Sequence, residues 1–139
     1  MALGLLGLFG CAGERSNNLG AHGGELAACP TSPNCVSSQV VDEKHRIAPI
    51  SFSGEPQTAF VRLKLVLKQR GDTTIIDEKS GYLLVEFRTN LFVDDGEFLL
   101  DPEQSIIHVR SASRRGYSDL GKNRSRMEEI RRQFAATGH

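Results

Sequence analysis

The alternation of apolar and polar residues divides the chain into two helical stretches with strands outside them. Between residues 56 and 70 the apolar positions recur every three or four residues, which predicts a helix with one buried face. A second helix is expected from Ser118 or Asp119, either of which can cap a helix N-terminus, to about Ala135. The expected buried side chains are Ala59, Phe60, Leu63, Val66 and Leu67 in the first helix, and Leu120, Met127, Ile130 and Phe134 in the second.

The other stretches carry β-branched and aromatic residues, in places with a two-residue period, which is typical of antiparallel strands. Pro49 restricts the first of these strands to a sheet edge, because proline cannot donate a ladder hydrogen bond. The fourth strand is expected to be interrupted at Asp94, Asp95 and Gly96, where the pattern suggests a bulge. The expected strands cover residues 47–52, 73–77, 82–89, 91–100 and 104–110.

These elements predict the fold class. A chain of 139 residues with 39% hydrophobic composition forms about one domain. Two amphipathic helices and a run of antiparallel strands predict an α+β fold, with a single antiparallel sheet of about four strands and two helices packed on one face. The folded domain is expected to cover residues 29–139.

The first residues of the chain point to a membrane anchor. Residues 2–10 are apolar and uncharged, and a small residue precedes Cys11. This arrangement resembles the lipobox of bacterial lipoproteins, which implies that residues 1–11 are a signal-like segment ending at a lipidated Cys11. Two or more acyl chains would hold a domain stably at a bilayer. Residues 12–28 then predict a flexible tether of roughly 20–25 Å. A frayed apolar N-terminus without an anchor is the alternative.

The two remaining cysteines are expected to form a disulfide. Cys29 and Cys35 are separated by five residues, which is wider than the spacing of zinc ligand pairs or of a thioredoxin-type motif. Once Cys11 is lipidated, they are an even pair, and an oxidising envelope compartment favours a bond between them. We expect no metal and no cofactor.

The charge of the chain is balanced overall but unevenly distributed. The formal net charge of zero argues against a general nucleic-acid binder, so no nucleic acid is expected as a partner. Residues 94–103 contain five acidic and no basic residues, whereas residues 110–132 contain eight basic and three acidic ones. These segments either neutralise each other or leave a basic face for an anionic partner. If the lipobox were not functional, a cytoplasmic protein binding nucleic acid through the basic last helix would become an alternative.

The segment between the last strand and the last helix is the richest in candidate site residues. Gly116 lies just before the expected helix N-terminus, where backbone N–H groups favour an anion such as a phosphate or a carboxylate. The alternative is an internal polar network among Arg110, Arg114, Tyr117, Asp119 and Asn123. The candidate ligand-binding residues are Arg110, Ser111, Ser113, Arg114, Gly116, Tyr117, Asp119, Asn123 and Arg124.

Asp94 and Asp95 form the second candidate site. On a regular strand two adjacent side chains point to opposite faces, so the two carboxylates cannot form a close dyad. We expect them to pair with Arg110 or Arg114 through charge-assisted hydrogen bonds. The alternative is an acid/base or metal site, which would require a bulge that aims both carboxylates one way. No elbow motif supports a serine nucleophile.

Several segments occur together in an order that resembles a known family. They are Cys29-Pro-Thr-Ser-Pro-Asn-Cys-Val-Ser-Ser38, His45 with Ile47-Ala-Pro49, Phe92-Val-Asp-Asp95, Val109-Arg-Ser-Ala-Ser-Arg114, Gly116-Tyr-Ser-Asp-Leu-Gly121 and Asn123-Arg124. The chain is similar over Cys29 to about Phe134 to the bacterial envelope family called domain of unknown function 1499. Gly96 stands where that family usually has an apolar residue. The resemblance implies a lipoprotein or periplasmic protein and carries no established activity.

These observations together predict a non-catalytic accessory domain. We expect it to be lipid-anchored in the bacterial envelope, facing the periplasm and favouring the outer membrane, and to bind an anionic envelope ligand or a protein partner. The alternative is a hydrolase that uses Asp94, Asp95 and His108, with or without a metal.

Overall fold

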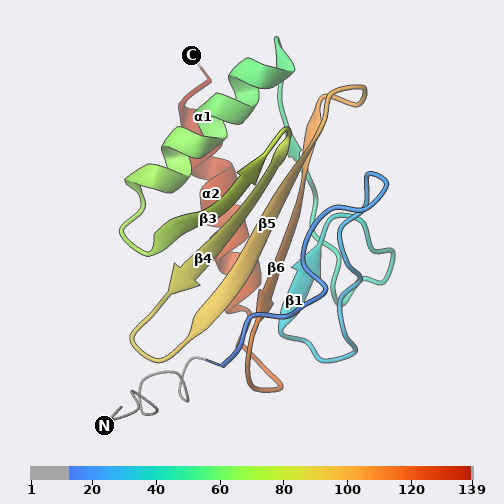
Figure 1. The fold of residues 1–139 in the computed structure, drawn as a ribbon, viewed down its shortest axis with the longest axis vertical. Helices are drawn as coiled ribbons and strands as arrows, with labels where there is room; N and C mark the ends of the chain where they lie inside the picture. The colour runs from blue at the N-terminus through green and yellow to red at the C-terminus, as the bar shows by residue number, and fades with distance from the viewer. Residues whose placement is uncertain (1–12, 139) are drawn as a thin grey trace, which may run out of the picture.

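The computed structural model describes residues 13–138 and contains one six-stranded antiparallel sheet with two helices (Figure 1). The strand order is β1-β6-β5-β4-β3, and β2 pairs with the other part of β6. The elements in chain order are β1 (Cys35–Ser37), β2 (Ile50–Ser51), α1 (Pro56–Gln69), β3 (Thr73–Lys79), β4 (Tyr82–Arg88), β5 (Val93–Asp101), β6 (Ile106–Ser113) and α2 (Lys122–Ala136).

The two helices cover one face of the sheet and enclose the main core. Both predicted helices are present, and both bury the apolar face expected for them except for Leu120. The sheet contributes alternate residues of its central strands, as a two-residue period requires. The buried core includes Leu63 and Leu67 of α1, Met127, Ile130 and Phe134 of α2, and Leu83, Val85, Phe87, Phe98, Ile107 and Val109 of the sheet.

The opposite face of the sheet is covered by the N-terminal segment. Figure 1 shows this segment, in blue, crossing in front of β6, whereas α2 lies behind the sheet. Leu26 is buried there in a second apolar cluster with Tyr82 and Leu84, and Leu19 and Ala21 pack against it. Residues 13–28 therefore do not form the flexible tether expected over 12–28. The expectation rested on their glycine content, and it overlooked that a face carrying Tyr82 and Leu84 must be covered.

The expectation of about four strands is wrong, because the sheet has six. β1 has three residues and β2 has two, so both are too short to show a periodic pattern. They form because each pairs with a different part of the long strand β6. The α+β class and the placement of both helices on one face agree with the prediction.

The strand that was expected to be interrupted is continuous. β5 pairs with β4 and β6 in regular register from Val93 onwards, and the bulge lies instead in β3, between Ile75 and Asp77. Gly96 lies within this regular strand, in contact with the neighbouring strand β4. A Cβ at this position would lie 2.3 Å from the ring of Phe87, so the missing side chain leaves the space that this ring fills.

The last helix begins later than expected. It starts at Lys122, after a segment in which Leu120 and Gly121 both have positive φ angles of 55° and 77°. Leu120 is 95% exposed and takes no part in the apolar stripe of α2. Within residues 13–138, neither helix is long and apolar enough to cross a membrane.

Candidate functional site

Asp94 and Asp95 point to opposite faces of the sheet, as the period of a strand predicts. Each is only 3% exposed, and each is paired with an arginine. Asp94 faces the helices, where its Oδ2 accepts a hydrogen bond of 2.9 Å from Arg126. Asp95 faces the N-terminal segment and accepts two hydrogen bonds, of 2.8 and 2.9 Å, from Arg114. The predicted pairing of this acid pair is confirmed for Asp95 with Arg114, whereas the partner of Asp94 was not foreseen.

Arg114 is the centre of a charged cluster on the face covered by the N-terminal segment. It also donates a hydrogen bond of 2.9 Å to Glu86 of β4, and Arg15 of the N-terminal segment binds the same carboxylate. Burial opposes ionisation of Glu86, but the two guanidinium groups outweigh it and lower the pKa of this carboxyl. The hydrogen bonds to Asp95 and Glu86 raise the pKa of Arg114, despite its burial. The cluster therefore ties the N-terminal segment to β4, β5 and β6.

A second cluster lies further along the same face, around the fully buried Glu97. Its Oε2 accepts hydrogen bonds from the Tyr82 hydroxyl at 2.6 Å and from the backbone N–H of Gly20 at 2.8 Å. Its Oε1 lies 3.5 Å from Arg110, which donates a hydrogen bond to the carbonyl of Ala28. Burial and the carboxylate together raise the pKa of Tyr82, and burial lowers the pKa of Arg110. These groups bind the middle of the N-terminal segment, at Gly20, and its C-terminal end, at Ala28, to the sheet.

The helix face holds a polar network around Asn123. This residue is fully buried at the start of α2, accepts a hydrogen bond from Ser111 and donates to Ser113. Its amide also donates to Asp119 at 2.7 Å, and the same carboxylate accepts the backbone N–H of Asn123. These hydrogen bonds lower the pKa of Asp119 although burial acts against them. A carboxylate therefore occupies the helix start, where the sequence suggested an external anion.

The remaining candidate residues do not converge on one anion site. Arg124 donates to the backbone carbonyls of Arg46 and Lys44. The carbonyl of Gly116 accepts a hydrogen bond from Asn34, and Tyr117 is 68% exposed. The residues expected to bind a ligand are thus divided between the two faces of the sheet and the exposed loop after β6. The three arginines among them, Arg110, Arg114 and Arg124, all donate hydrogen bonds to other groups of the chain.

The residues of the alternative hydrolase site lie apart from one another. His108 pairs in register with Leu99 and contacts Ser38 and Asp101, five residues along β6 from the position opposite Asp94. That separation is roughly 17 Å along a strand. Asp95 lies on the opposite face from Asp94 and is four residues, or roughly 13 Å, along β6 from His108, so the three groups do not meet at one site. Between residues 13 and 138, no three His, Cys, Asp or Glu side chains are placed to hold a metal ion.

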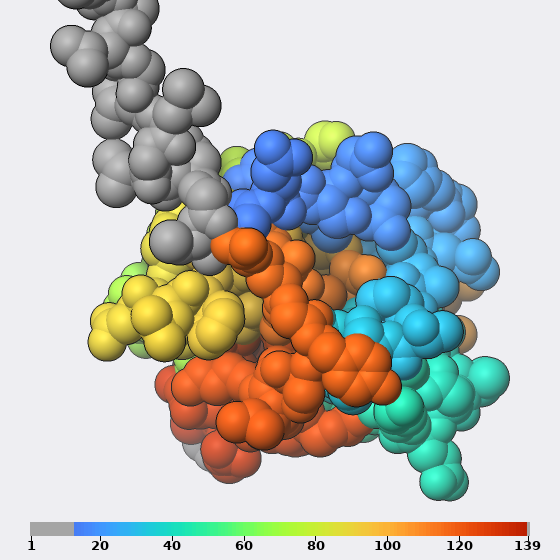
Figure 2. Space-filling view, turned by 90° about the horizontal axis from the view of Figure 1, so that it is seen from below, coloured from blue at the N-terminus to red at the C-terminus, as the bar shows by residue number. Residues whose placement is uncertain are grey.

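A pocket of about 510 Å³ opens at the end of the molecule where β4 meets β5 and β6 leads into α2. Figure 2 looks onto this end, with the β4–β5 turn in yellow beside the β6–α2 loop in orange. We call it the loop-end pocket, and Leu91, Phe92 and Leu120 are the large apolar residues of its lining. It is lined by Thr89, Asn90, Leu91, Phe92, Asp94, Ser113, Arg115, Ser118, Asp119, Leu120 and Lys122.

The three large apolar side chains that line this pocket are exposed to solvent. Leu91 is 72% exposed, Phe92 52% and Leu120 95%, and none of them belongs to the main buried core. Asp94 lies at the pocket floor, and its Oδ1 accepts no hydrogen bond from the described residues. Sequence reasoning missed Leu91 and Phe92 because it assigned them to a strand, although Asn90 just before them is a common turn residue.

The predicted disulfide is confirmed. Cys29 and Cys35 are bonded, with their Cα atoms 5.7 Å apart, and join the end of the N-terminal segment to β1. Cys11, the expected lipidation site, lies outside the described residues, so lipidation stays a prediction.

These features define the chain as a small α+β domain whose sheet is covered by two helices on one face and by its own N-terminal segment on the other. The sequence matches the family model described as protein of unknown function (DUF1499) over residues 25–134, and the chain belongs to this family. The resemblance seen in the sequence is thereby confirmed. No curated protein matches the sequence.

Proposed function

We propose that this chain is a non-catalytic binding domain of the bacterial envelope, held at a membrane through a lipidated Cys11, which binds its partner in the loop-end pocket. The observation that carries the proposal is the exposure of Leu91, Phe92 and Leu120 around one pocket. Its volume falls within the range of small-molecule sites, and its walls combine these three apolar side chains with polar and charged ones. The partner is therefore expected to insert an apolar group.

The charged clusters support a binding role rather than a catalytic one. A catalytic acid or base needs access to its substrate, but Asp95, Glu97 and Arg110 are each less than 5% exposed and engaged with internal partners. Their arrangement supports a structural role in joining the N-terminal segment to the sheet. An anion at the start of α2, as the sequence suggested, is disfavoured because Asp119 occupies that position.

The test uses the neutral dye N-phenyl-1-naphthylamine, which fluoresces when it enters an apolar site. Leu120→Ser removes one apolar wall of the pocket, and we expect about a tenfold loss of dye affinity, because burying a leucine contributes about 1.5–3 kcal/mol. Val41→Ser is the matched control, since Val41 is 90% exposed and lies outside the pocket. Equal affinity of both variants for the dye would contradict the proposal.

A further inference from the structure

We propose that the loop end docks on the surface of an anionic lipid bilayer, with Leu91, Phe92, Tyr117 and Leu120 entering the headgroup layer. The inference deepens the proposed function and rests on it, because the two loops that would enter the membrane also line the loop-end pocket. It names the partner as a lipid surface, whereas the proposed function requires only an apolar group of any origin.

The distribution of exposed apolar side chains supports this partner. Eight large apolar side chains in the described part of the chain are exposed, and four of them belong to the two loops at this end. Phe92 and Tyr117 are the aromatic ones, at 52% and 68% exposure. Aromatic rings with an apolar body are favoured at the membrane–water interface, and tyrosine adds a hydroxyl that stays hydrated there.

Basic side chains flank the apolar ones. Lys122 and Arg115 are exposed and line the pocket, and the Arg88 side chain, at the end of β4, is 61% exposed. Each basic group near an anionic surface adds attraction to the insertion of the apolar side chains. Glu14 and Asp119 are acidic residues at the same end, so the three basic side chains leave it with a small excess of positive charge. An exposed apolar tip with such an excess is the pattern expected of a surface that lies on anionic lipid.

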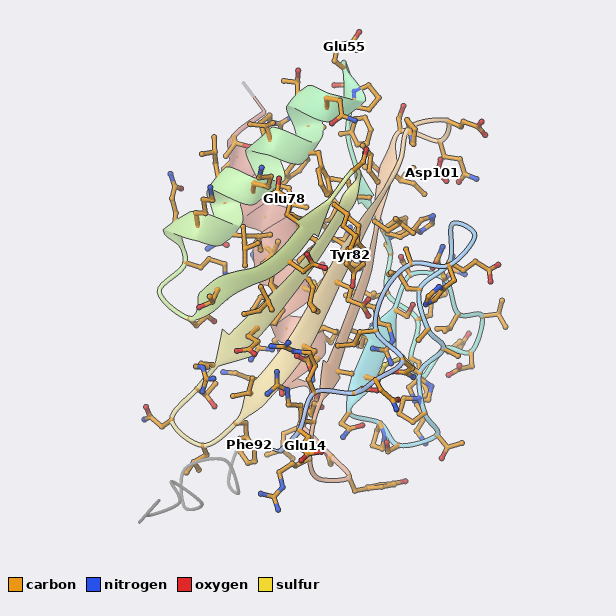
Figure 3. The ribbon with its side chains drawn as sticks, viewed as in Figure 1. Glu14, Glu55, Glu78, Tyr82, Phe92 and Asp101 are labelled. Atoms are coloured by element: carbon orange, nitrogen blue, oxygen red, sulfur yellow. A yellow bond between two sulfur atoms is a disulfide. The ribbon has the colours of Figure 1, made fainter. Side chains whose placement is uncertain are left out.

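The path of the chain brings the N-terminus to the same place. Gly13 packs so closely on the β6–α2 loop that an added Cβ would lie 2.6 Å from Cγ of Arg115. Figure 3 shows Glu14 beside Phe92 at this end of the molecule, opposite Glu55 and Asp101. Cys11 precedes Gly13 by two residues, which span at most roughly 7 Å. Acyl chains on Cys11 would therefore enter a bilayer next to Leu91, Phe92 and Leu120.

The chain contains no tryptophan, so a single introduced tryptophan reports its own position. We would compare Phe92→Trp with Leu65→Trp in the full-length chain. The two replaced residues are matched in exposure, at 52% and 53%, but Leu65 lies on α1, away from the loop end. Each variant is mixed with phosphatidylglycerol vesicles that contain lipids brominated on their acyl chains, which quench only tryptophans within the bilayer. Leu91→Trp provides a second reporter at the loop end.

We expect vesicles to quench Phe92→Trp and Leu91→Trp and to leave Leu65→Trp unchanged. Lys122→Gln should weaken vesicle binding about fivefold, the contribution of one basic group near an anionic surface. Equal quenching of all three tryptophans, or no vesicle binding, would overturn the inference. If the dye still binds the pocket under those conditions, the proposed function stands and the partner is not a bilayer. If dye binding is lost but quenching at the loop end remains, the bilayer inference holds and the pocket proposal fails.

Discussion

Asp94 and Asp95 are neighbours in β5, yet one carboxylate is bonded to Arg126 of α2 and the other to Arg114 at the end of β6, on opposite sides of the sheet. The strand thus uses two consecutive acids to hold two different layers. Arg126 also stacks on Phe87, 4.6 Å from the ring centroid, and so joins the ion pair to the main core. Arg114 reaches Glu86, which in turn binds Arg15 of the N-terminal segment. The acid pair of β5 therefore connects the helices, the sheet and the N-terminal segment.

The first prediction concerns the ion pair between Arg114 and Asp95. Arg114→Gln leaves the buried Asp95 with only the more distant Arg15, whose Nε lies 3.8 Å from its Oδ1. Removing one member of a buried pair costs about 3–5 kcal/mol of unfolding free energy. Arg15 stays close to Glu86 and offsets part of this loss, so we expect about 3 kcal/mol in urea unfolding. Arg132→Gln, at an exposed position of α2, should change the free energy by less than about 0.5 kcal/mol. Equal effects of the two substitutions would show that the cluster does not stabilise the fold.

A second prediction follows from the packing of Gly96. Gly96→Ala forces a methyl group against the Phe87 ring, and overpacking of this kind costs about 1–3 kcal/mol of unfolding free energy. Gly71→Ala is the control, since nothing lies within 4 Å of a Cβ there. In a Phe87→Leu background the cost of Gly96→Ala should shrink, because the clashing ring atoms are gone. A cost that is unchanged in that background would point to a backbone cause instead.

The third prediction is a loss of stability in acid. The pKa of Glu86 is lowered in the folded chain from its ordinary value of 4.5, as are those of Asp72 and Asp119 from 3.8. The unfolded chain therefore takes up protons first as the pH falls. The urea midpoint should stay constant from neutral pH to about pH 5.5 and decline below about pH 4.5. Glu86→Gln should reduce the steepness of that decline, and an unchanged slope would exclude Glu86 as a contributor.

The fourth prediction concerns the disulfide between Cys29 and Cys35. Its reduction should lower the unfolding free energy by about 2–3 kcal/mol, the value that chain entropy gives for a loop of this length. Unfolding in urea with and without dithiothreitol measures the difference. A chain carrying both Cys29→Ser and Cys35→Ser should show no response to the reductant. If this variant still responded, the effect of the reductant would have another origin.

Much of the framework could be predicted from local pattern. The helix over α1 and the strands β3, β4 and β6 follow from periodicity and turn residues, and the opposite orientations of Asp94 and Asp95 follow from the pleat of a strand alone. The disulfide followed from cysteine spacing and the expected compartment. These features depend on residues close together in the sequence.

The features that sequence reasoning missed depend on partners far away in the chain. β1 and β2 exist because β6 offers them an edge, and residues 13–28 are ordered because the sheet face beneath them carries Glu86, Glu97 and apolar neighbours. The partners of two candidate anion-binding arginines are also distant in the sequence. Arg114 and Arg124 look available in the sequence, but a carboxylate from β5 and carbonyls of residues 44–46 already bind them.

The most direct test of the central claim is an NMR titration of the isotope-labelled chain with the neutral amphiphile octyl glucoside, below its micelle concentration. If the loop-end pocket is the binding surface, the backbone amide signals that shift should cluster in residues 89–94 and 113–122. The amide signals of the turn around residues 101–105 should not shift. Shifts scattered over the surface, or concentrated on α1, would contradict the claim.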